Sequence, residues 1–338
     1  MLSKIASMKA IIFYLMTVCL TSSVLEAEEL VKRTQVMMGT YITISLEKEE
    51  IKHSKALFER LKRVEMALSS YDESAEIYRL NHEHEAEIST DTYEALSLSQ
   101  SYYKATKGYF DITIGSITKG LFHFGEEERV PSKKELSEAK VDFHGLHFTK
   151  KRAWIDEGVK IDLGGMGKGF GVDKGVKLLK ERGVSRGVVA LSGDIFCLHA
   201  CEMSIQDPFS SGTLASFKMA QKNTAISTSG NYRRYVQSAQ YNHLINPKTR
   251  SSQKTFASIS LISDLYSNSD LDAYATAASV MPKGEAFTFL NALRRVGYLA
   301  VTNDKKMHMN EGFKSLTKGL EITELEGSTS MKPLIFLP

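Results

Sequence analysis

The sequence predicts an α+β fold in one continuous domain. Two hydrophobic periods stand close together: residues 38–46 alternate as in a strand, and residues 57–68 repeat at helical spacing. The later elements mix in the same way, without the regular strand–helix alternation of a parallel sheet. The chain has 338 residues, 42% hydrophobic and 25% charged, which is enough for a substantial core. No repeat, low-complexity tract or flexible linker divides it after residue 30, so we expect a single domain over residues 28–338.

The first half of the chain contains one predicted strand and two predicted helices. From Met38 to Leu46, isoleucine or leucine alternates with polar or aromatic residues, which is strand periodicity. Leucine and valine recur every three or four residues between Leu57 and Leu68, which predicts a helix. A second helix is expected to begin at Asp91, where Glu94 completes a capping-box-like pair, and to stop at Gly108.

A glycine-rich bend lies at the middle of the chain. Before it, Trp154-Ile155 and Val159 to Leu163 flank an Asp-Glu-Gly turn and predict a hairpin. After it, apolar residues at helical spacing from Val172 predict a helix that Gly183 ends. The remaining predicted elements are strands at Val188 to Leu191 and Tyr298 to Thr302, and helices at Asp270 to Met281 and Glu285 to Val296.

The first 27 residues have the layout of a secretory signal peptide. Lys4 and Lys9 precede an apolar run from Ala10 to Leu20, and polar residues follow. The run is shorter than the roughly 20 apolar residues of a spanning helix, so we expect cleavage after Ala27 and an exported protein. Lipid attachment at Cys19 is disfavoured because a valine, not a small residue, precedes that cysteine.

Charge and cysteine content exclude some functions. The net charge of +3 is small and the basic residues are scattered among acidic ones, so nucleic acid is not an expected partner. After cleavage only Cys197 and Cys201 remain. They are expected to be structural thiols or a local disulfide, because further ligands for a closed metal site are missing.

The glycine-rich bend is the most informative segment. It runs from Ile161 to Asp173 with glycines at 164, 165, 167, 169 and 171 around Lys168. Between a strand and a helix, such glycines let the backbone N–H groups approach an anion closely. The spacing matches neither the dinucleotide fingerprint nor the P-loop, in which Ser or Thr would stand at Gly169. We therefore expect a phosphate site of another kind.

Two further segments contain candidate reactive groups. His243 lies between polar residues and an Asn-Pro turn signal, where loops position side chains. Asp272 and Thr276 are four residues apart, hence on one helical face. Carboxylate and hydroxyl oxygens are ligands that Mg²⁺ accepts.

Together these segments resemble the ApbE family, the FAD:protein FMN transferases, over nearly the whole mature chain. The shared elements occur in the family's order: Met38-Gly39-Thr40, Tyr71 with Ser74 to Asn81, Gly108 to Asp111, Asp162 to Asp173, Ser192-Gly193-Asp194, Thr228-Ser229-Gly230, His243 to Pro247, and Asp272 to Thr276.

The resemblance implies a bilobed, T-fold-related structure with antiparallel sheets flanked by helices. It also implies a periplasmic, Mg²⁺-dependent enzyme that moves FMN from FAD, its substrate, to a Thr or Ser hydroxyl of an acceptor protein and releases AMP. The acceptor would be a membrane redox subunit, and the enzyme would be attached to the inner membrane.

The resemblance also assigns roles to residues. His243 would activate the acceptor hydroxyl. Asp162 and Lys168 would hold the nucleotide and pyrophosphate. The flavin end of the FAD site would be lined by Met38, Tyr71, Tyr109, Phe110 and Asp111. Magnesium would be bound by Asp272 and Thr276 with backbone oxygens at Gly165 and Ala275.

The chain departs from the family pattern at three positions. Asn246 replaces the usual Asp, and Ser192 and Arg250 each replace a usual Gly. Two other functions use the same residues: an FAD pyrophosphatase, in which water replaces the acceptor, and a protein that binds or stores FAD without chemistry.

Overall fold

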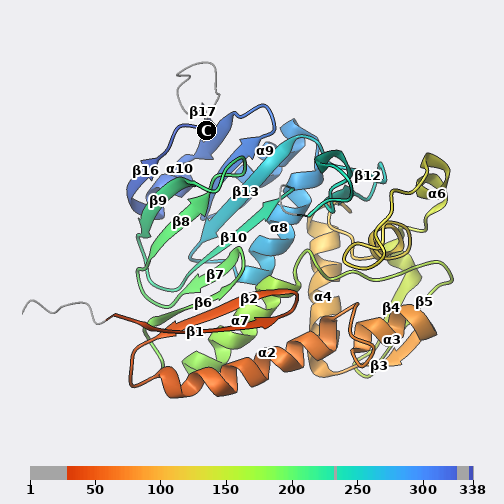
Figure 1. Cartoon of the computed structure of the whole chain (residues 1–338), viewed down its shortest axis with the longest axis horizontal. Coiled ribbons are helices and arrows are strands. Elements are labelled where there is room, and N and C mark those ends of the chain that lie inside the picture. The colour runs from red at the N-terminus through yellow and green to blue at the C-terminus, as the bar shows by residue number, and fades with distance from the viewer. Residues whose placement is uncertain (1–28, 232–233, 326–334, 338) are drawn as a thin grey trace, which may run out of the picture.

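The computed structural model describes residues 29–231, 234–325 and 335–337. The predicted signal peptide lies outside the described residues. The fold is α+β, with largely antiparallel sheets and flanking helices, as predicted (Figure 1). Within the described part of the chain, no helix is both long enough and apolar enough to cross a membrane.

A nine-stranded sheet organises the described residues. Its strand order is β1-β2-β6-β7-β10-β13-β14-β15-β17, with only the β15–β17 pair parallel. The strands are β1 Val31–Met37, β2 Thr40–Leu46, β6 Gly187–Leu191, β7 Asp194–Cys197, β10 Thr224–Gly230, β13 Phe256–Ser263, β14 Val296–Thr302, β15 Met307–Asn310 and β17 Ile335–Leu337.

Three smaller sheets complete the strand set. They are β16 Thr317–Ile322 with β9 Thr213–Met219 and β8 Glu202–Gln206; β3 Glu85–Glu87 with β5 Arg152–Ile155 and β4 Leu146–Phe148; and β11 Ile245–Asn246 with β12 Ser251–Ser252.

The α-helices of the described residues range from four to sixteen residues in length. They are α2 Ser54–Leu68, α3 Glu76–Glu83, α4 Thr90–Ala105, α5 Gly115–Thr118, α6 Lys133–Glu138, α7 Gly167–Glu181, α8 Asn268–Val280, α9 Lys283–Ala292 and α10 Glu311–Ser315. Short 3₁₀ turns lie at Ile51–His53, Phe143–Gly145 and Ala239–Tyr241.

Helices and the β8–β9–β16 sheet cover opposite faces of the large sheet. Helices α7 and α8 pack on β6, β7, β10 and β13, and α2 packs on α7. On the other face, Ile205 and Phe217 join Ile226, Ile262 and Leu299 in one apolar cluster. Each face of the central strands is therefore buried, which explains why β13 and β14 are buried along their whole length.

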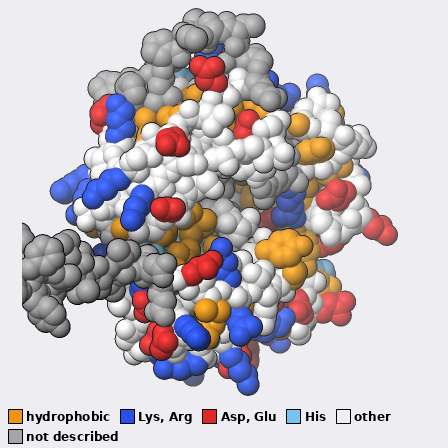
Figure 2. All heavy atoms as spheres, turned by 60° about the vertical axis from the view of Figure 1, so that its left-hand side comes forward, with side chains coloured by type: hydrophobic (Ala, Val, Ile, Leu, Met, Phe, Trp, Pro, Cys, Tyr) orange, Lys and Arg blue, Asp and Glu red, His pale blue; other side chains and the backbone are white. Residues whose placement is uncertain are grey.

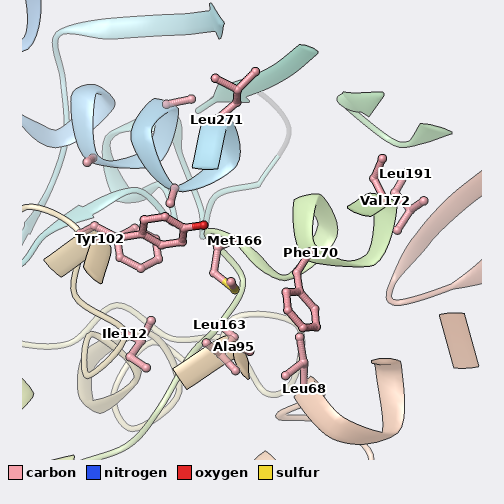
Figure 3. Packing of buried hydrophobic residues seen from close by; sticks show 14 of the residues in the cluster. Leu68, Ala95, Tyr102, Ile112, Leu163, Met166, Phe170, Val172, Leu191 and Leu271 are labelled. Carbon is pink, nitrogen blue, oxygen red and sulfur yellow. The ribbon is translucent and has the colours of Figure 1, made fainter. Parts of the chain in front are cut away.

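Buried apolar side chains pack against the glycine-rich bend. Met166 and Phe170 are almost completely buried and belong to the main apolar cluster with Leu68 of α2 and Leu163 (Figure 3). Close packing of these side chains fixes the path of the backbone between residue 163 and the start of α7.

Most predicted elements form within two or three residues of the expected positions. The helix predicted to end at Val296 ends at Ala292 instead, because Val296 begins β14. Two further predictions were wrong. The hairpin around the 156–158 turn does not form, because β5 already pairs with β3 and β4 on its two edges. The chain after the turn instead meets residues 112–114: Asp162 N donates to Ile112 O at 2.8 Å.

The predicted capping pair of the second helix was also wrong, although α4 begins at Thr90, one residue from the expected start. The N-cap of α4 is Ser89, whose side chain accepts the N–H of Thr92. Asp91 instead pairs with Arg60 at 2.6 Å, and Glu94 pairs with Lys174. Both carboxylates therefore tie α4 to neighbouring helices, which the local sequence pattern does not reveal.

Candidate functional site

A large cavity brings together most of the residues that the sequence analysis singled out. Its volume is about 1280 Å³. Its lining includes Met38, Tyr71, Tyr109, Phe110, Asp111, Asp162, Gly165, Lys168, His243, Asp272 and Thr276. These residues come from both halves of the chain, so the cavity is a product of the tertiary fold.

The glycine-rich bend forms one wall of the cavity at the start of α7. Lys168 is the second residue of this helix, so its ammonium lies near the positive end of the helix dipole. Gly169 allows α7 to cross α8 closely, because a Cβ there would lie 2.3 Å from the Asn268 carbonyl oxygen. This crossing places Lys168 opposite Asp272 of α8.

Lys168 forms ion pairs with two buried carboxylates. Its Nζ lies 2.9 Å from Asp194 Oδ2 and 3.2 Å from Asp272 Oδ2. Burial opposes the charge on the lysine, but Asp194 and Asp272 outweigh it and raise the pKa of Lys168. Burial, together with repulsion from Asp272, raises the pKa of Asp194. Lys168 is therefore held as a cation at the cavity wall.

The donors next to this lysine fit a magnesium ion. Thr276 Oγ1 lies 3.3 Å from the Gly165 carbonyl oxygen, and Asp272 is one helical turn away from Thr276. A Cβ at residue 165 would lie 3.0 Å from Thr276 Cγ2, so a side chain there would fill the space between these oxygens. The described residues contain no cluster of three or more His, Cys, Asp and Glu for a metal. A carboxylate, a hydroxyl and a carbonyl instead suit Mg²⁺ that keeps waters and binds substrate phosphates.

Ala275 does not line this cavity. It is fully buried in α8, and its carbonyl oxygen accepts the hydroxyl of Ser279 at 2.7 Å. The geometry therefore places Gly165, Asp272 and Thr276 at the cavity but not Ala275.

Asp162 is held as an anion in a second part of the cavity wall. Its carboxylate accepts the Thr118 hydroxyl at 2.6 Å and the Gly164 N–H at 2.9 Å. Burial opposes its ionisation, but the charge of Lys119 and these hydrogen bonds keep the pKa of Asp162 below its usual value. A fixed carboxylate can accept hydrogen bonds from the N–H or O–H groups of a ligand.

Two cationic side chains contact Tyr71. Lys119 Nζ lies 3.2 Å from the centroid of its ring, and Arg234 donates to its hydroxyl and, at 3.2 Å, to the Phe124 carbonyl. The Lys119 ammonium is buried and has no hydrogen-bond partner among the described residues. Lys119 covers one face of the ring, and 43% of Tyr71 is exposed.

Aromatic and apolar side chains line the region that the resemblance assigns to the flavin. Tyr109 donates to Glu285 at 3.0 Å, and Lys248 lies over its ring. Asp111 accepts both the N–H and the hydroxyl of Thr113, while burial raises the pKa of Asp111. These contacts leave little rotational freedom to Tyr109 and Asp111.

Met38 occupies a strained turn at the same cavity. Met38 and Gly39 join β1 to β2, both with positive φ, and the Met38 N–H donates to Glu65 at 2.6 Å. Positive φ is uncommon for a residue other than glycine, although the exposed His84 and Lys107 also adopt it here. The turn presents the Met38 side chain to the cavity lining.

His243 is half-buried at the cavity wall and is oriented by backbone. Its Nδ1 lies 3.1 Å from the Arg234 carbonyl oxygen, which can only accept a hydrogen bond. We assign the ring proton to Nδ1 from this contact, so Nε2 is the basic nitrogen. Burial and then the charge of Arg234 lower the pKa of His243 to about 4, which keeps the ring neutral near pH 7.

The three departures from the family pattern have local explanations. Asn246 does not contact His243: its amide donates to Val280 O, and its side-chain oxygen accepts the N–H groups of Lys248 and Thr249. Ser192 and Arg250, which replace family glycines, both have positive φ. Glycine is the usual residue in that conformation, so these two positions are strained here.

The sequence analysis missed several residues of the site. Asp194 was visible in the Ser-Gly-Asp turn after a buried strand, but its pairing with Lys168 depends on how β7 meets α7. Arg234 and the β8 residues Met203 to Gln206 line the cavity, and Lys119 contacts Tyr71, but none of them belongs to a motif.

The sequence matches one known protein family. Residues 38–300 match the model of the ApbE family. An FAD:protein FMN transferase of Haemophilus influenzae is 26% identical over 287 residues, covering 77% of this chain and 82% of that protein. One of Treponema pallidum is 25% identical over 299 residues, covering 78% and 81%.

Solved structures share the fold. The ApbE protein of Thermotoga maritima superposes with a TM-score of 0.78 at 23% identity, over 86% of this chain and 100% of that chain. The flavin transferase ApbE of Vibrio cholerae gives a TM-score of 0.74 at 23% identity, over 85% and 99%. The chain therefore belongs to the ApbE family.

Proposed function

We propose that this chain is an FAD:protein FMN transferase that attaches FMN, through a phosphoester, to a Thr or Ser hydroxyl of an acceptor protein. The observation that carries the proposal is the meeting of the α7 N-terminus with Asp272 and Thr276 of α8 at one cavity wall. This wall combines the Lys168 cation with a metal-type oxygen set, and both suit the negative charge of a diphosphate. The names of the curated relatives support the same activity.

Asp272, Thr276 and the Gly165 carbonyl would hold Mg²⁺ at this wall. When bound, the ion supplies charge neutralisation for the diphosphate and for the charge that develops during transfer. Lys168 places a second positive charge beside it, fixed by Asp194. The two positive groups would orient the diphosphate so that the phosphorus on the FMN side is open to attack.

The rest of the FAD molecule would follow the cavity lining. Asp162 would accept hydrogen bonds from the nucleotide, and the exposed part of Tyr71 offers a stacking surface for an aromatic ring. Met38, Tyr109, Phe110 and Asp111 would enclose the flavin end.

His243 would act as the general base. Its Nε2 would take the proton of the acceptor hydroxyl while that oxygen bonds to the phosphorus on the FMN side. The bond from this phosphorus to the bridging oxygen breaks, and AMP leaves with the bonding electrons. The Arg234 carbonyl keeps the proton of the ring on Nδ1 during the step.

The location and partner belong to the same proposal. The signal-peptide pattern of residues 1–27 supports export to the periplasm, with the enzyme attached to the inner membrane. A membrane redox subunit that carries covalent FMN would then be the acceptor, because it presents its hydroxyl in the same compartment.

AMP release from FAD tests the function. The mature chain is incubated with FAD and Mg²⁺, with or without the flavin-accepting domain of a redox subunit, and AMP and the acceptor mass are measured. A transferase releases AMP in step with a gain of one FMN on the acceptor. Equal AMP release without acceptor and no mass gain would identify a pyrophosphatase, and FAD binding without AMP would identify a storage protein.

A further inference from the structure

The edge strand β8 runs along the wall of the cavity. Met203, Ser204, Ile205 and Gln206 all belong to the cavity lining. In the β16-β9-β8 sheet this strand stands at the end of the order, so among the described residues no other strand pairs with its outer edge. An edge of this kind is a template for one more strand.

The register shows which groups of β8 point outward. Cys201 O accepts the Met219 N–H at 2.8 Å, and Met203 stands opposite Phe217. In an antiparallel pair, hydrogen-bonded and non-hydrogen-bonded positions alternate, so Cys201, Met203 and Ile205 bond to β9. The backbone N–H and C=O groups of Glu202 and Ser204 therefore face the outer edge. Ser204 is exposed, and it lies at the cavity.

The free edge of β1, at the end of the large sheet, provides a contrast. Its outer residues include Lys32 and Arg33, and lysine or arginine on an edge discourages pairing with another chain. Strand β8 carries one charge, at Glu202, and the residues from Met203 to Gln206 carry none. Of these two edges, β8 is the less protected, and it is the one that borders the cavity.

The cavity is large enough for a second occupant. At about 1280 Å³ it exceeds the roughly 300–1,000 Å³ of usual small-molecule pockets. Apolar groups also stand at its rim: Val36 and Tyr41 face each other across β1 and β2, both 70% exposed, and Tyr41 belongs to the lining. Figure 2 shows hydrophobic side chains gathered in a hollow on the face that comes forward from the left of Figure 1.

We propose that the acceptor protein binds in an extended conformation along the outer edge of β8 and adds a fourth strand to that sheet. This inference rests on the proposed function, which requires a protein hydroxyl to reach the diphosphate. Backbone hydrogen bonds to Glu202 and Ser204 fix the register, and alternate side chains of the bound segment point into the cavity. Only a Thr or Ser at an inward position reaches the reacting phosphorus, while Tyr41 and Val36 contact the neighbouring side chains.

A proline at position 204 tests the backbone contact. Ser204→Pro removes the outward N–H, and edge strands tolerate proline where the N–H faces away from the sheet. Ser204→Ala is the matched variant, because it removes the hydroxyl and keeps the N–H. We expect the KM for the acceptor domain to be about tenfold higher in Ser204→Pro than in Ser204→Ala, with the same Kd for FAD in both. Equal KM values in the two variants would overturn the proposal.

Hydrogen exchange tests the same contact without a substitution. In the unmodified chain with FAD, the amides of Glu202 and Ser204 should exchange more slowly when the acceptor domain is added. Unchanged exchange at β8 during FMN transfer would overturn the proposal but leave the transferase function intact. Slow exchange of these amides without acceptor would also overturn it. If the protection from exchange increases with protein concentration, a second copy occupies the edge. If the protection is lost when residues 1–28 are removed, the chain's own N-terminal segment occupies it.

Discussion

His243 and Asp194 show how single side chains in the cavity depend on their neighbours. The carbonyl of Arg234 and the burial of the ring make His243 a neutral base with its proton on Nδ1. Asp194 is fully buried, accepts the Ser227 hydroxyl at 2.5 Å and pairs with Lys168. One residue is thus prepared to take a proton, and the other holds a cation in place.

The pH dependence of transfer should reflect the lowered pKa of His243. The base works only when neutral, and its pKa of about 4 keeps it neutral down to that pH. We therefore expect the acidic limb of kcat/KM that belongs to His243 near pH 4, not near the usual 6.5. A limb near 6.5 that vanishes in His243→Gln would contradict this, and His144→Gln, at an exposed histidine outside the cavity, is the control.

The lowered pKa of His243 also makes the stability of the fold depend on pH. Between pH 6.5 and about 4 the unfolded chain binds a proton at His243 that the folded chain does not bind. Stability is therefore lost as the pH falls through this window. Urea unfolding of His243→Gln should show a smaller loss over the same range.

Replacing Asp194 should weaken magnesium binding, because Lys168 stays in place and then pairs with Asp272 alone. In Asp194→Asn, the amide no longer neutralises Lys168, so the ammonium depends on Asp272 alone. Magnesium then competes with Lys168 for this carboxylate, and we expect its Kd to rise by about tenfold or more. Calorimetric titration with Mg²⁺ measures the change, and an unaltered Kd would show that Asp194 does not position Lys168.

At the scale of elements, the crossing of α7 and α8 determines the site. Lys168 belongs to one helix and Asp272 to the other, and Gly169 lies at their closest approach. Asp173 strengthens the crossing, because its carboxylate accepts the N–H groups of Asn268 and Ser269 at the start of α8. The glycine-rich bend therefore brings two helices together, and the Gly169 N–H adds a hydrogen bond to Asp272 at 3.1 Å.

Gly169→Ala should separate these helices. The new Cβ would lie 2.3 Å from the Asn268 carbonyl oxygen, which is backbone and has little room to move. We expect a loss of about 1–3 kcal/mol in the free energy of unfolding, as for overpacked cores, together with weaker FAD binding. Gly284→Ala in α9 is the matched control: no atom lies within 4 Å of its Cβ, and helix propensity predicts a gain of up to about 1 kcal/mol. Equal stability of the two variants in urea would contradict the role of Gly169.

At the scale of the whole molecule, the cavity couples ligand binding to folding. Its lining includes β1–β2 turn residues, the 109–112 segment, α7, the 243–247 loop and α8. A ligand that fills the cavity would contact segments from Met38 to Val280. Because the unfolded chain has no such cavity, the ligand would stabilise only the native state.

FAD should therefore raise the Tm of the mature chain, and Mg²⁺ should increase the effect. At a concentration of 100 times Kd a ligand adds about 2.7 kcal/mol of stability. Riboflavin should have a much smaller effect because it lacks the diphosphate that Lys168 and the bend would bind. Equal shifts with riboflavin and FAD in thermal unfolding would show that the diphosphate is not recognised.

The sequence predicted much of the fold because local signals are strong in this chain. Alternation identified β2, helical spacing identified α2 and α7, and the glycines located the bend before α7. The failures have a common cause. The 154–163 hairpin and the Asp91 cap were locally plausible, but β3, β4, Arg60 and Lys174 provided better partners from distant segments.

By itself, the sequence determined most of the elements and the family and predicted the site residues, because periodicity, glycine content and motif order are local properties. The tertiary structure decided which of those residues meet. The Lys168–Asp194–Asp272 cluster and the Lys119–Tyr71 stack join residues that are far apart in the chain. The free edge of β8 at the cavity is likewise decided by sheet order, since strand pairing satisfies backbone groups across long sequence separations and no single segment encodes it.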